Sequence, residues 1–430
     1  MDILRFITAG SVDDGKSTLI GRLLYDSKSI LQDQLEAIES QSRSKADGEI
    51  DLALLTDGLR AEREQGITID VAYKYFSTPR RKFIIADAPG HIQYTRNMVT
   101  GASNSDLAII LVDARNGIIE QTRRHSIIAS LLALPHVVVA INKMDLVSFS
   151  EERFNEIVAE YRVIAETLGL KDVHYIPISA LGGDNIVERS PNLAWFKGAP
   201  LLEFLENVEV QQGTDLTHPR FQVQYVIRPQ TEDLHDYRGY AGMISSGTYR
   251  KGDAVTVLPS GVQSCIKAIE VAGTDAVPHE VDEAYAPQNI ILHLEDDVDV
   301  SRGDTIVSTN DKPLVEDAPM VQQEIETLLC WMDAKPLTVG SKYLLQHKSR
   351  TVRAVVRSID YKLDVNTLER TKNVASLGLN DIAKVSLKTA SPLVFDGYTT
   401  LRSNGGAILV DETSYGTVGA CMLQTKPTIS

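Results

Sequence analysis

The stretch Gly10-Ser-Val-Asp-Asp-Gly-Lys-Ser17 decides the fold of the first part of this chain. It matches the pattern G-x-x-x-x-G-K-[ST], in which backbone N–H groups surround phosphates, the lysine reaches the β/γ oxygens and the hydroxyl faces Mg²⁺. An apolar run, Ile3–Thr8, precedes it, and an amphipathic run, Ser17–Leu24, follows it. This order predicts strand, loop and helix, with the helix N-terminus adding its positive end to the anion site. We therefore expect a phosphate-binding loop here, with Lys16 as its cation.

A second apolar run, from Phe83, ends in Asp87-Ala-Pro-Gly-His91. Parallel strands present their carboxyl ends to ligands, so Asp87 is expected to hold Mg²⁺ through water, although Asp-x-x-Gly alone is also compatible with a plain turn. Gly90 offers an N–H to a γ-phosphate, and residues 90 to about 104 would form a switch that hydrolysis releases. His91 is predicted to orient the attacking water, which makes it a catalytic candidate beside Lys16.

Between these two motifs lies Gly66-Ile-Thr68. The hydroxyl and backbone carbonyl of Thr68 suit a hard cation, so the predicted metal residues are Ser17, Thr68 and, through water, Asp87. The alternative is that Thr68 is only a β-branched residue that starts the strand 69–73.

The choice of base is indicated by Asn142-Lys-Met-Asp145, which follows a buried apolar run. The carboxylate of Asp145 can accept hydrogen bonds from N1 and the 2-amino group of guanine, a pattern that adenine does not offer, so GTP is favoured over ATP. Asn142 can brace the loops, Lys143 can lie over the base, and the backbone N–H groups of Ser179 and Ala180 can meet guanine O6. The complete predicted GTP site is Gly10, Ser11, Val12, Asp13, Asp14, Gly15, Lys16, Ser17, Thr18, Asp87, Ala88, Pro89, Gly90, His91, Asn142, Lys143, Asp145, Ser179, Ala180 and Leu181.

Composition places the chain among soluble, multidomain proteins. It has 430 residues, 43% of them hydrophobic and 23% charged, and no apolar run reaches the roughly 20 residues of a membrane span. The first strand begins too close to Met1 for a signal peptide, and the three cysteines, Cys265, Cys330 and Cys421, form no CxxC pair. We therefore expect a cytoplasmic protein without a membrane partner. The net charge of −15 also argues against a nucleic-acid partner, although a local basic face would be compatible with it.

The pattern of elements changes near residue 210. Before it, apolar runs at 107–113, 137–142 and 173–178 alternate with helical runs, which predicts a parallel α/β sheet ending near residue 208. After a polar linker at 210–219, short strands separated by turns predict small β-barrels. The expected fold class is multidomain, an α/β P-loop GTPase domain followed by two small all-β barrels. The expected domains are a P-loop GTP-binding domain over 1–209, one barrel over 219–311 and another over 312–430.

Longer stretches carry a resemblance that covers essentially the whole chain. They are Gly10–Asp26, Asp57–Tyr73, Gln93–Ser103, Gln121–His125 and Trp195–Gly198. In them the chain resembles the translational GTPase superfamily of elongation factor Tu, and most closely the GTPase large subunits (CysN) of bacterial sulfate adenylyltransferase. The resemblance implies a GTPase, with GTP and Mg²⁺, that forms a heterodimer or higher assembly with a separate catalytic small subunit (CysD).

In that family, the resemblance further implies, GTP hydrolysis drives adenylyl transfer from ATP to sulfate, giving adenosine 5′-phosphosulfate and pyrophosphate for sulfate assimilation and cysteine biosynthesis. By the same resemblance, Val12 and Ile67 form an apolar gate that flanks His91, and they join it as catalytic candidates. The reaction on sulfate would belong to the partner, because no sulfate or ATP site is assignable in this sequence.

Two features separate this chain from its relatives in translation. Asp14 stands where translation factors typically have histidine, and Gly405-Gly-Ala407 stands where they have Gly-Arg-Phe. Both favour the sulfate branch over the alternative function, an elongation factor Tu-like translation GTPase that binds aminoacyl-tRNA. Ile92 stands where an acidic residue is expected in either branch. Few residues follow the last expected strand, so no fused adenylylsulfate kinase is expected within the chain.

Overall fold

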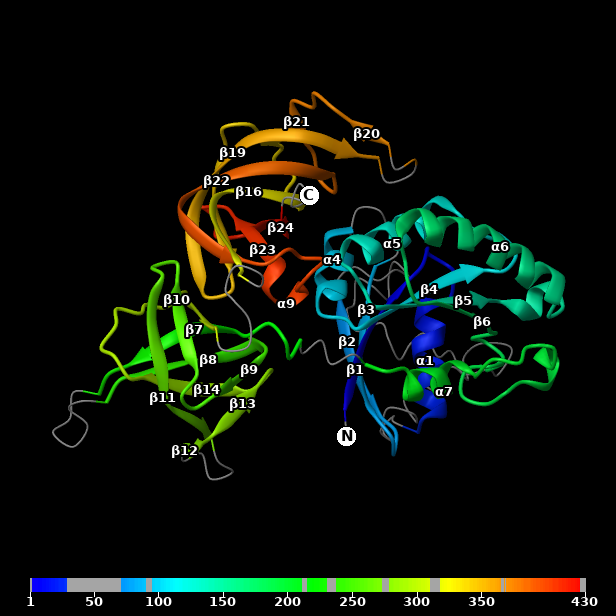
Figure 1. Cartoon of the computed structure of the whole chain (residues 1–430). Helices are drawn as coiled ribbons and strands as arrows, with labels where there is room; N and C mark the ends of the chain where they lie inside the picture. The colour runs from blue at the N-terminus through cyan, green and yellow to red at the C-terminus, as the bar shows by residue number, and fades with distance from the viewer. Residues whose placement is uncertain are drawn as a thin grey trace. The chain divides into compact units, whose positions relative to one another are not determined.

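The computed structural model describes residues 2–28, 71–89, 95–210, 215–229, 237–272, 278–309, 318–364, 367 and 369–425. Its contacts group the chain into two compact units, the first of Met1–Gln211 with Val365–Thr367 and the second of Gln212–Asp364 with Leu368–Ser430. Figure 1 shows an α/β unit and a unit built of strands. The expected fold class, an α/β domain followed by two all-β barrels, is confirmed. In the part that the structure describes, no helix is both long enough and apolar enough to cross a membrane.

The first unit is built on a six-stranded sheet with the order β2-β3-β1-β4-β5-β6. Its elements in chain order are β1 (Ile3–Ala9), α1 (Lys16–Asp26), β2 (Ala72–Ser77), β3 (Lys82–Asp87), α4 (Thr95–Ser103), β4 (Leu107–Asp113), α5 (Glu120–Leu131), β5 (His136–Asn142), α6 (Glu151–Leu168), β6 (Val173–Pro177) and α7 (Leu201–Asn207). Every residue of β4 and β5 is buried, as expected for central strands with both faces covered.

One edge strand of the sheet runs antiparallel to the others. β2 pairs with β3 antiparallel, whereas β3, β1, β4, β5 and β6 are parallel to one another. The reason is the short connection between β2 and β3, closed by a hydrogen bond from Thr78 N to Arg81 O of 2.9 Å. A hairpin of this length joins only antiparallel strands, since a parallel pair needs a longer crossover. The predicted parallel sheet is therefore present, with one antiparallel strand added at this edge.

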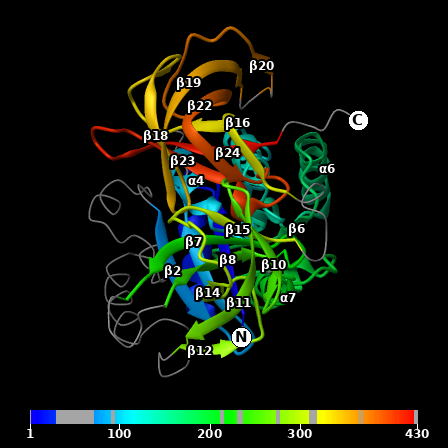
Figure 2. The ribbon, with the colours of Figure 1, turned by 60° about the vertical axis from the view of Figure 1, so that its left-hand side comes forward.

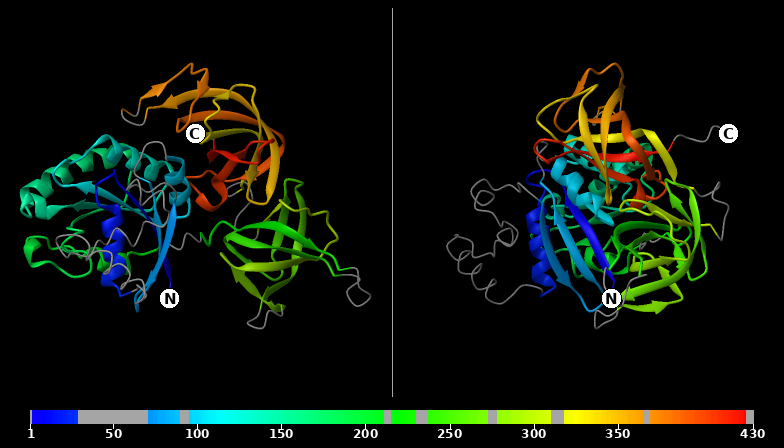
Figure 3. Two further views of the ribbon diagram at one scale, coloured as in Figure 1. Left: turned by 180° about the vertical axis from the view of Figure 1, so that it is seen from behind. Right: turned by 90° about the vertical axis from the view of Figure 1, so that its left-hand side faces the viewer.

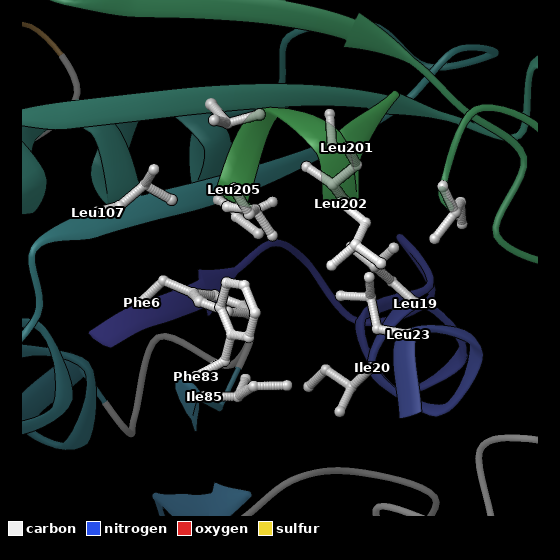
Figure 4. Packing of buried hydrophobic residues seen from close by; sticks show 14 of the residues in the cluster. Phe6, Leu19, Ile20, Leu23, Phe83, Ile85, Leu107, Leu201, Leu202 and Leu205 are labelled. Atoms are coloured by element: carbon white, nitrogen blue, oxygen red, sulfur yellow. The ribbon is translucent and has the colours of Figure 1, made fainter. Parts of the chain in front are cut away.

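Helices cover both faces of the sheet. On one face, α1 and α7 pack against β1 and β3 in a buried apolar cluster that includes Phe6, Leu23, Phe83 and Leu205 (Figure 4). On the other face, α4 contacts β1 and β3, α5 contacts β4, and α6 contacts β6. The view from behind in Figure 3 shows these two layers on either side of the strands. This arrangement fixes the start of α1 beside the carboxyl ends of β1, β3, β4 and β5.

The first barrel belongs to the second unit. Its strands are β7 (Arg220–Ile227), β8 (Gly239–Ser246), β9 (Thr248–Arg250), β10 (Ala254–Leu258), β11 (Val262–Ala272), β12 (Pro278–Val281), β13 (Glu283–Tyr285), β14 (Asn289–Leu294) and β15 (Thr305–Ser308). The order β10-β15-β7-β8-β14-β11 closes into a ring because β10 also pairs with β11, and β12 extends it. Buried side chains such as Phe221, Tyr240 and Tyr249 fill the ring.

The second barrel is also a closed ring of strands, but its strands follow a different order along the chain. Its elements are β16 (Met320–Trp331), β17 (Leu337–Thr338), β18 (Lys342–His347), β19 (Arg350–Leu363), β20 (Arg370–Thr371), β21 (Ser376–Leu377), β22 (Ile382–Phe395), α9 (Arg402–Gly405), β23 (Gly406–Val410) and β24 (Thr417–Gln424). The ring β18-β23-β24-β16-β22-β19 closes through the pairing of β18 with β19, around buried Trp331 and Phe395. Figure 2 gives a second view of its strands.

Within the second unit, the two barrels meet at a joint that contains buried charges. Leu258 and Val307 of the first barrel form a small apolar cluster with Val394 of the second. Beside it, the guanidinium of Arg220 donates from Nε and Nη2 to the two carboxylate oxygens of Asp396, both at 3.0 Å. Asp396 also accepts from Asn404 Nδ2 at 2.6 Å, so this buried pair is fully hydrogen-bonded. The barrels are thereby linked by an ion pair as well as by apolar contact.

Candidate nucleotide site

The phosphate-binding loop connects β1 to α1 and holds a buried cation. Only 7% of Lys16 is exposed, and its Nζ donates to the backbone oxygens of Gly10 and Ser11, each at 3.0 Å. Burial lowers the pKa of Lys16, and the carboxylates of Asp87, Asp14 and Asp13 oppose that effect. The ammonium is thus placed inside the loop against neutral carbonyl oxygens. This is the environment in which an anion adds the most favourable interaction.

The backbone of the loop is shaped for close approach to a ligand. Gly15 has φ +94, and a Cβ atom there would lie 2.5 Å from Nδ2 of Asn142. Only glycine satisfies both conditions, so the P-loop glycine is required here by geometry. Gly15 also precedes α1, whose N-terminus has no side-chain cap and no acidic residue in its first turn. Because no side chain caps these first N–H groups, they form with the helix dipole a ready anion site.

Asp14 supports the loop from inside. Its carboxylate Oδ2 accepts from the N–H of Ser11 at 2.5 Å, and the residue is only 4% exposed. Burial raises the pKa of Asp14, while the hydrogen bond from Ser11 and the charge of Lys16 oppose the rise. The hydrogen bond between Asp14 and Ser11 therefore stabilises the conformation of the loop.

Asp87 ends β3 and lies next to β1 in the sheet. Its Oδ1 accepts from Thr8 Oγ1 at 3.2 Å, and only 2% of the residue is exposed. Ser17 occupies the first turn of α1, and Ala88 continues the chain with its N–H donating to Thr8 O at 3.3 Å. A buried carboxylate and a hydroxyl at this edge are oxygen ligands of the kind that Mg²⁺ takes, so the described residues fit a magnesium ion.

Asn142 braces two of the loops. At the end of β5, its Nδ2 donates to Asp14 O at 2.7 Å, and its Oδ1 accepts from the N–H of Ala180 at 2.9 Å. One buried amide side chain therefore ties the phosphate loop to the loop after β6. Asp145 lies just beyond, in the 3₁₀ turn Met144–Val147, and is partly exposed. This leaves its carboxylate accessible at the same edge of the sheet.

Lys143 links a further pair of segments. Its Nζ lies 2.9 Å from Asp113 Oδ2 and also donates to the backbone oxygen of Asp13 in the phosphate loop. Burial alone would raise the pKa of Asp113, but hydrogen bonds from Arg115 and Lys143 lower it to about 2. Sequence reasoning missed Asp113, although it ends a buried apolar strand in the same way as Asp87 and Asn142 do. That shared position was the signal that could have found it.

The second segment predicted to recognise the base, Ser179-Ala-Leu181, differs from expectation in its donors. The N–H of Ser179 donates to Asp184 O at 3.2 Å, and that of Ala180 is taken by Asn142. On the other side of the segment, Arg22 of α1 donates from Nε to Ala180 O at 3.3 Å and from Nη2 to Leu181 O at 2.5 Å. The N–H groups of Ser179 and Ala180 are thus engaged within the protein. Sequence reasoning also missed Arg22. No local pattern predicts its contact with Ala180, which is 158 residues away along the chain.

A buried histidine also lies near Lys16. His125 of α5 is 4% exposed, and burial, with the charge of nearby Lys16, lowers its pKa to about 3, so the imidazole is neutral at physiological pH. The predicted residues Ile67, Thr68, Gly90 and His91 lie outside the described residues. The remaining predicted residues meet at one edge of the sheet, around the start of α1.

Comparison with known proteins identifies the family. Residues 1–211 match the elongation factor Tu GTP binding domain, and residues 324–424 match the GTP-eEF1A C-terminal domain-like family. The sulfate adenylyltransferase subunit 1 of Bacteroides fragilis (strain YCH46) is 51% identical over 424 residues, which cover 98% of this chain and 86% of that protein. This chain belongs to the sulfate adenylyltransferase subunit 1 family. The subunit 1 of Sulfurovum sp. (strain NBC37-1) is 52% identical over 427 residues, covering 98% of this chain and 87% of that protein.

The subunit 1 family also includes longer relatives. The bifunctional enzyme CysN/CysC of Mycobacterium tuberculosis (strain H37Rv) is 51% identical over 422 residues, covering 98% of this chain and 67% of that protein. Among solved structures, the Ski7 GTPase-like domain of S. cerevisiae, bound to GDP and inorganic phosphate, has a TM-score of 0.51 and 17% identity, with 99% and 97% of the two chains covered. That likeness shows the shared fold. The predicted family is confirmed, and this subunit 1 homologue carries a GTPase domain that binds a guanine nucleotide.

Proposed function

We propose that this chain is the GTP-hydrolysing subunit of a sulfate adenylyltransferase. GTP hydrolysis here drives the transfer of adenylyl from ATP to sulfate, which a separate catalytic subunit carries out with release of pyrophosphate. The observation that carries the proposal is the 51% identity, over 98% of this chain, to a protein named sulfate adenylyltransferase subunit 1. The alternative, a translation factor that binds aminoacyl-tRNA, is disfavoured by Asp14 and by the net charge of −15.

Binding of GTP divides between two groups of residues. Lys16 and the N–H groups at the start of α1 hold the β- and γ-phosphates, since this cation is buried among neutral acceptors. Asp145 accepts hydrogen bonds from the guanine N1 and 2-amino groups. Asn142 holds the phosphate loop and the loop after β6 together. Selectivity for guanine follows because adenine would leave the Asp145 carboxylate without donors.

Ser17 and Asp87 are the described residues that would hold Mg²⁺, Asp87 through water, and we propose Thr68 as the third. When bound, the ion would neutralise charge on the phosphate oxygens. Hydrolysis requires a water molecule aligned with the γ-phosphorus, and we assign its orientation to His91, with Val12 and Ile67 as the apolar gate beside it. The attack breaks the bond to the β-phosphate oxygen and leaves GDP and inorganic phosphate. Of these three residues, only Val12 lies in the described part of the chain.

The partner that we propose is the small catalytic subunit CysD, bound in a heterodimer or higher assembly in the cytoplasm. The name subunit 1 on the relatives supports a second subunit.

The test is to purify the tagged chain from its native cells in a non-hydrolysable GTP analogue and to identify the protein and RNA that accompany it. We expect a stoichiometric second protein, and sulfate-dependent release of pyrophosphate from ATP that GTP stimulates in the purified complex. The variant His91→Ala should keep GTP binding and lose most of the GTP-stimulated rate. Recovery of aminoacyl-tRNA without an adenylyltransferase would overturn the proposal. So would a rate of pyrophosphate release that does not change when GTP is added.

A further inference from the structure

Arg22 lies on α1, six residues after Lys16, and its side chain contacts the segment Ser179-Ala-Leu181. Its guanidinium bonds two successive backbone oxygens, those of Ala180 and Leu181. The side chain is 20% exposed, and Asp26, one turn further along α1, pairs with it at 3.6 Å. An arginine that is held by its own helix and bonds two carbonyl groups fixes the orientation of the peptide between them.

That orientation determines where the next N–H group points. The peptide between Ala180 and Leu181 is trans, so its C=O and N–H point in opposite directions. Because Arg22 holds the Ala180 oxygen toward α1, the Leu181 N–H faces away from α1. No acceptor for that N–H is found among the residues that the structure describes. The neighbouring N–H groups of Ser179, Ala180 and Gly182 all have acceptors in the protein.

We infer that Arg22 is a positioning residue for base recognition, which presents the Leu181 N–H to the O6 atom of a bound guanine. The inference rests on the proposed GTP site and assigns its O6 contact to Leu181. The described contacts of Arg22 are with backbone oxygens and with Asp26, so its proposed role does not require contact with the base or the phosphates. It acts through the peptide that it holds, and so it connects the helix of the phosphate loop to the loop that recognises the base. Guanine, which carries O6, gains from this contact, whereas a purine without O6 does not.

The experiment compares two nucleotides in wild-type protein and in Arg22→Met. The first is GTP, and the second is the triphosphate of 2-aminopurine riboside, which keeps the 2-amino group and lacks O6. Kd is measured by calorimetry at fixed salt and Mg²⁺. We expect the variant to bind GTP about ten-fold more weakly and the analogue less than two-fold more weakly, because only GTP loses an oriented donor. At saturating GTP, kcat should stay within about two-fold, so the change falls on KM.

Two further variants separate positioning from folding. Arg22→Lys keeps the charge but lacks the planar pair of donors, so we expect an intermediate loss that is still specific for GTP. Arg123→Met is the matched control, because Arg123 is a surface arginine of α5 whose ion pair with Glu160 lies outside the site. It should leave both Kd values unchanged. If Arg22→Met does not fold, Arg22→Lys alone decides the question.

Equal weakening of both nucleotides would overturn the inference, since it would show a general effect on the loop. Unchanged GTP binding in Arg22→Met would overturn it as well. Failure of the proposed function is distinguishable from both results: wild-type protein would then fail to bind GTP, or would bind it without stimulating pyrophosphate release in the complex.

Discussion

The phosphate loop and the joint between the barrels each bury a cation, but the two cations have different hydrogen-bond acceptors. Lys16 is 7% exposed and donates to two carbonyl oxygens, whereas Arg220 is 3% exposed and meets both oxygens of a carboxylate. A buried charge is unfavourable unless a partner compensates it. In the barrel joint, that partner is part of the chain. In the phosphate loop, the hydrogen-bond acceptors of Lys16 are neutral carbonyl oxygens, and we propose that the phosphates of a bound nucleotide supply the compensating charge.

The largest effect is expected at the barrel joint. Asp396→Ala would leave Arg220 buried without its carboxylate, and we expect a loss of about 3 to 5 kcal/mol in the free energy of unfolding of the second unit. Denaturant unfolding monitored by tryptophan fluorescence would measure it, since Trp331 is buried in the second barrel. The double variant Arg220→Met/Asp396→Leu should recover most of this stability. A change below about 1 kcal/mol in Asp396→Ala would show that the pair is not structural.

The corresponding change in the phosphate loop should act on binding and not on folding. Lys16→Met removes a cation whose pKa burial lowers, so we expect the nucleotide-free protein to unfold at the same or a higher temperature. GTP binding should weaken by at least about a hundred-fold, because no other described side chain supplies the charge inside the loop. Calorimetry and thermal unfolding on the same sample measure both quantities. A large loss of stability in the nucleotide-free variant would contradict the contrast with Arg220.

The buried lysine Lys348 allows the stability cost of a buried charge to be measured as a function of pH. The ammonium of Lys348 lies 2.5 Å from Ser245 Oγ, and burial, with the nearby charge of Arg220, lowers its pKa to about 8, although Asp396 opposes this. Between pH 8 and pH 10.5 the unfolded chain holds a proton that the folded chain has lost, so stability rises with pH in that window. Lys348→Met should therefore be more stable than wild type at pH 7, by about 1 to 2 kcal/mol.

That advantage of Lys348→Met should shrink as the pH rises through this window, because the folded wild-type protein then no longer buries a charged lysine. Unfolding curves of both proteins at pH 7, 9 and 10 measure the difference. An advantage that stays constant with pH would assign the effect to packing and not to charge.

The smallest effects are expected around Asp113, where a buried carboxylate has two cationic partners. Asp113→Asn would weaken the hold on Lys143, and we expect GTP to bind about five-fold more weakly. Arg115→Ala is the matched control, because Arg115 is half exposed and Lys143 would keep its carboxylate; its Kd should change less than two-fold. Equal effects of the two substitutions would show that Asp113 does not act through Lys143.

The sequence predicted the parts of this molecule that depend on local pattern. The run 107–113 coincides with β4, because a long apolar segment indicates a buried strand. The three-residue strands β9 and β13 are too short to show alternation, so no pattern in the sequence predicts them. The antiparallel direction of β2 depends on a tight turn and not on the strand itself, so the predicted parallel sheet did not include it.

The same division holds for the site. The carboxylates and amides that end buried strands, such as Asp87 and Asn142, were accessible to sequence reasoning, since parallel strands bring their ends together. The contacts of Arg22 with Ala180 and of Arg220 with Asp396 join segments 158 and 176 residues apart. No period or motif encodes such pairs, because they arise only when the sheet and the barrels are complete.

The ion pair at the barrel joint also restricts how relatives of this protein can exchange segments. Its two halves stand at residues 220 and 396, in different barrels. A recombination breakpoint between those positions would separate the arginine from its carboxylate unless both parents carry the same pair. The stretch from 220 to 396 is therefore expected to be inherited as one block, and a chimera that exchanges a single barrel should keep its stability only where both parents carry the pair.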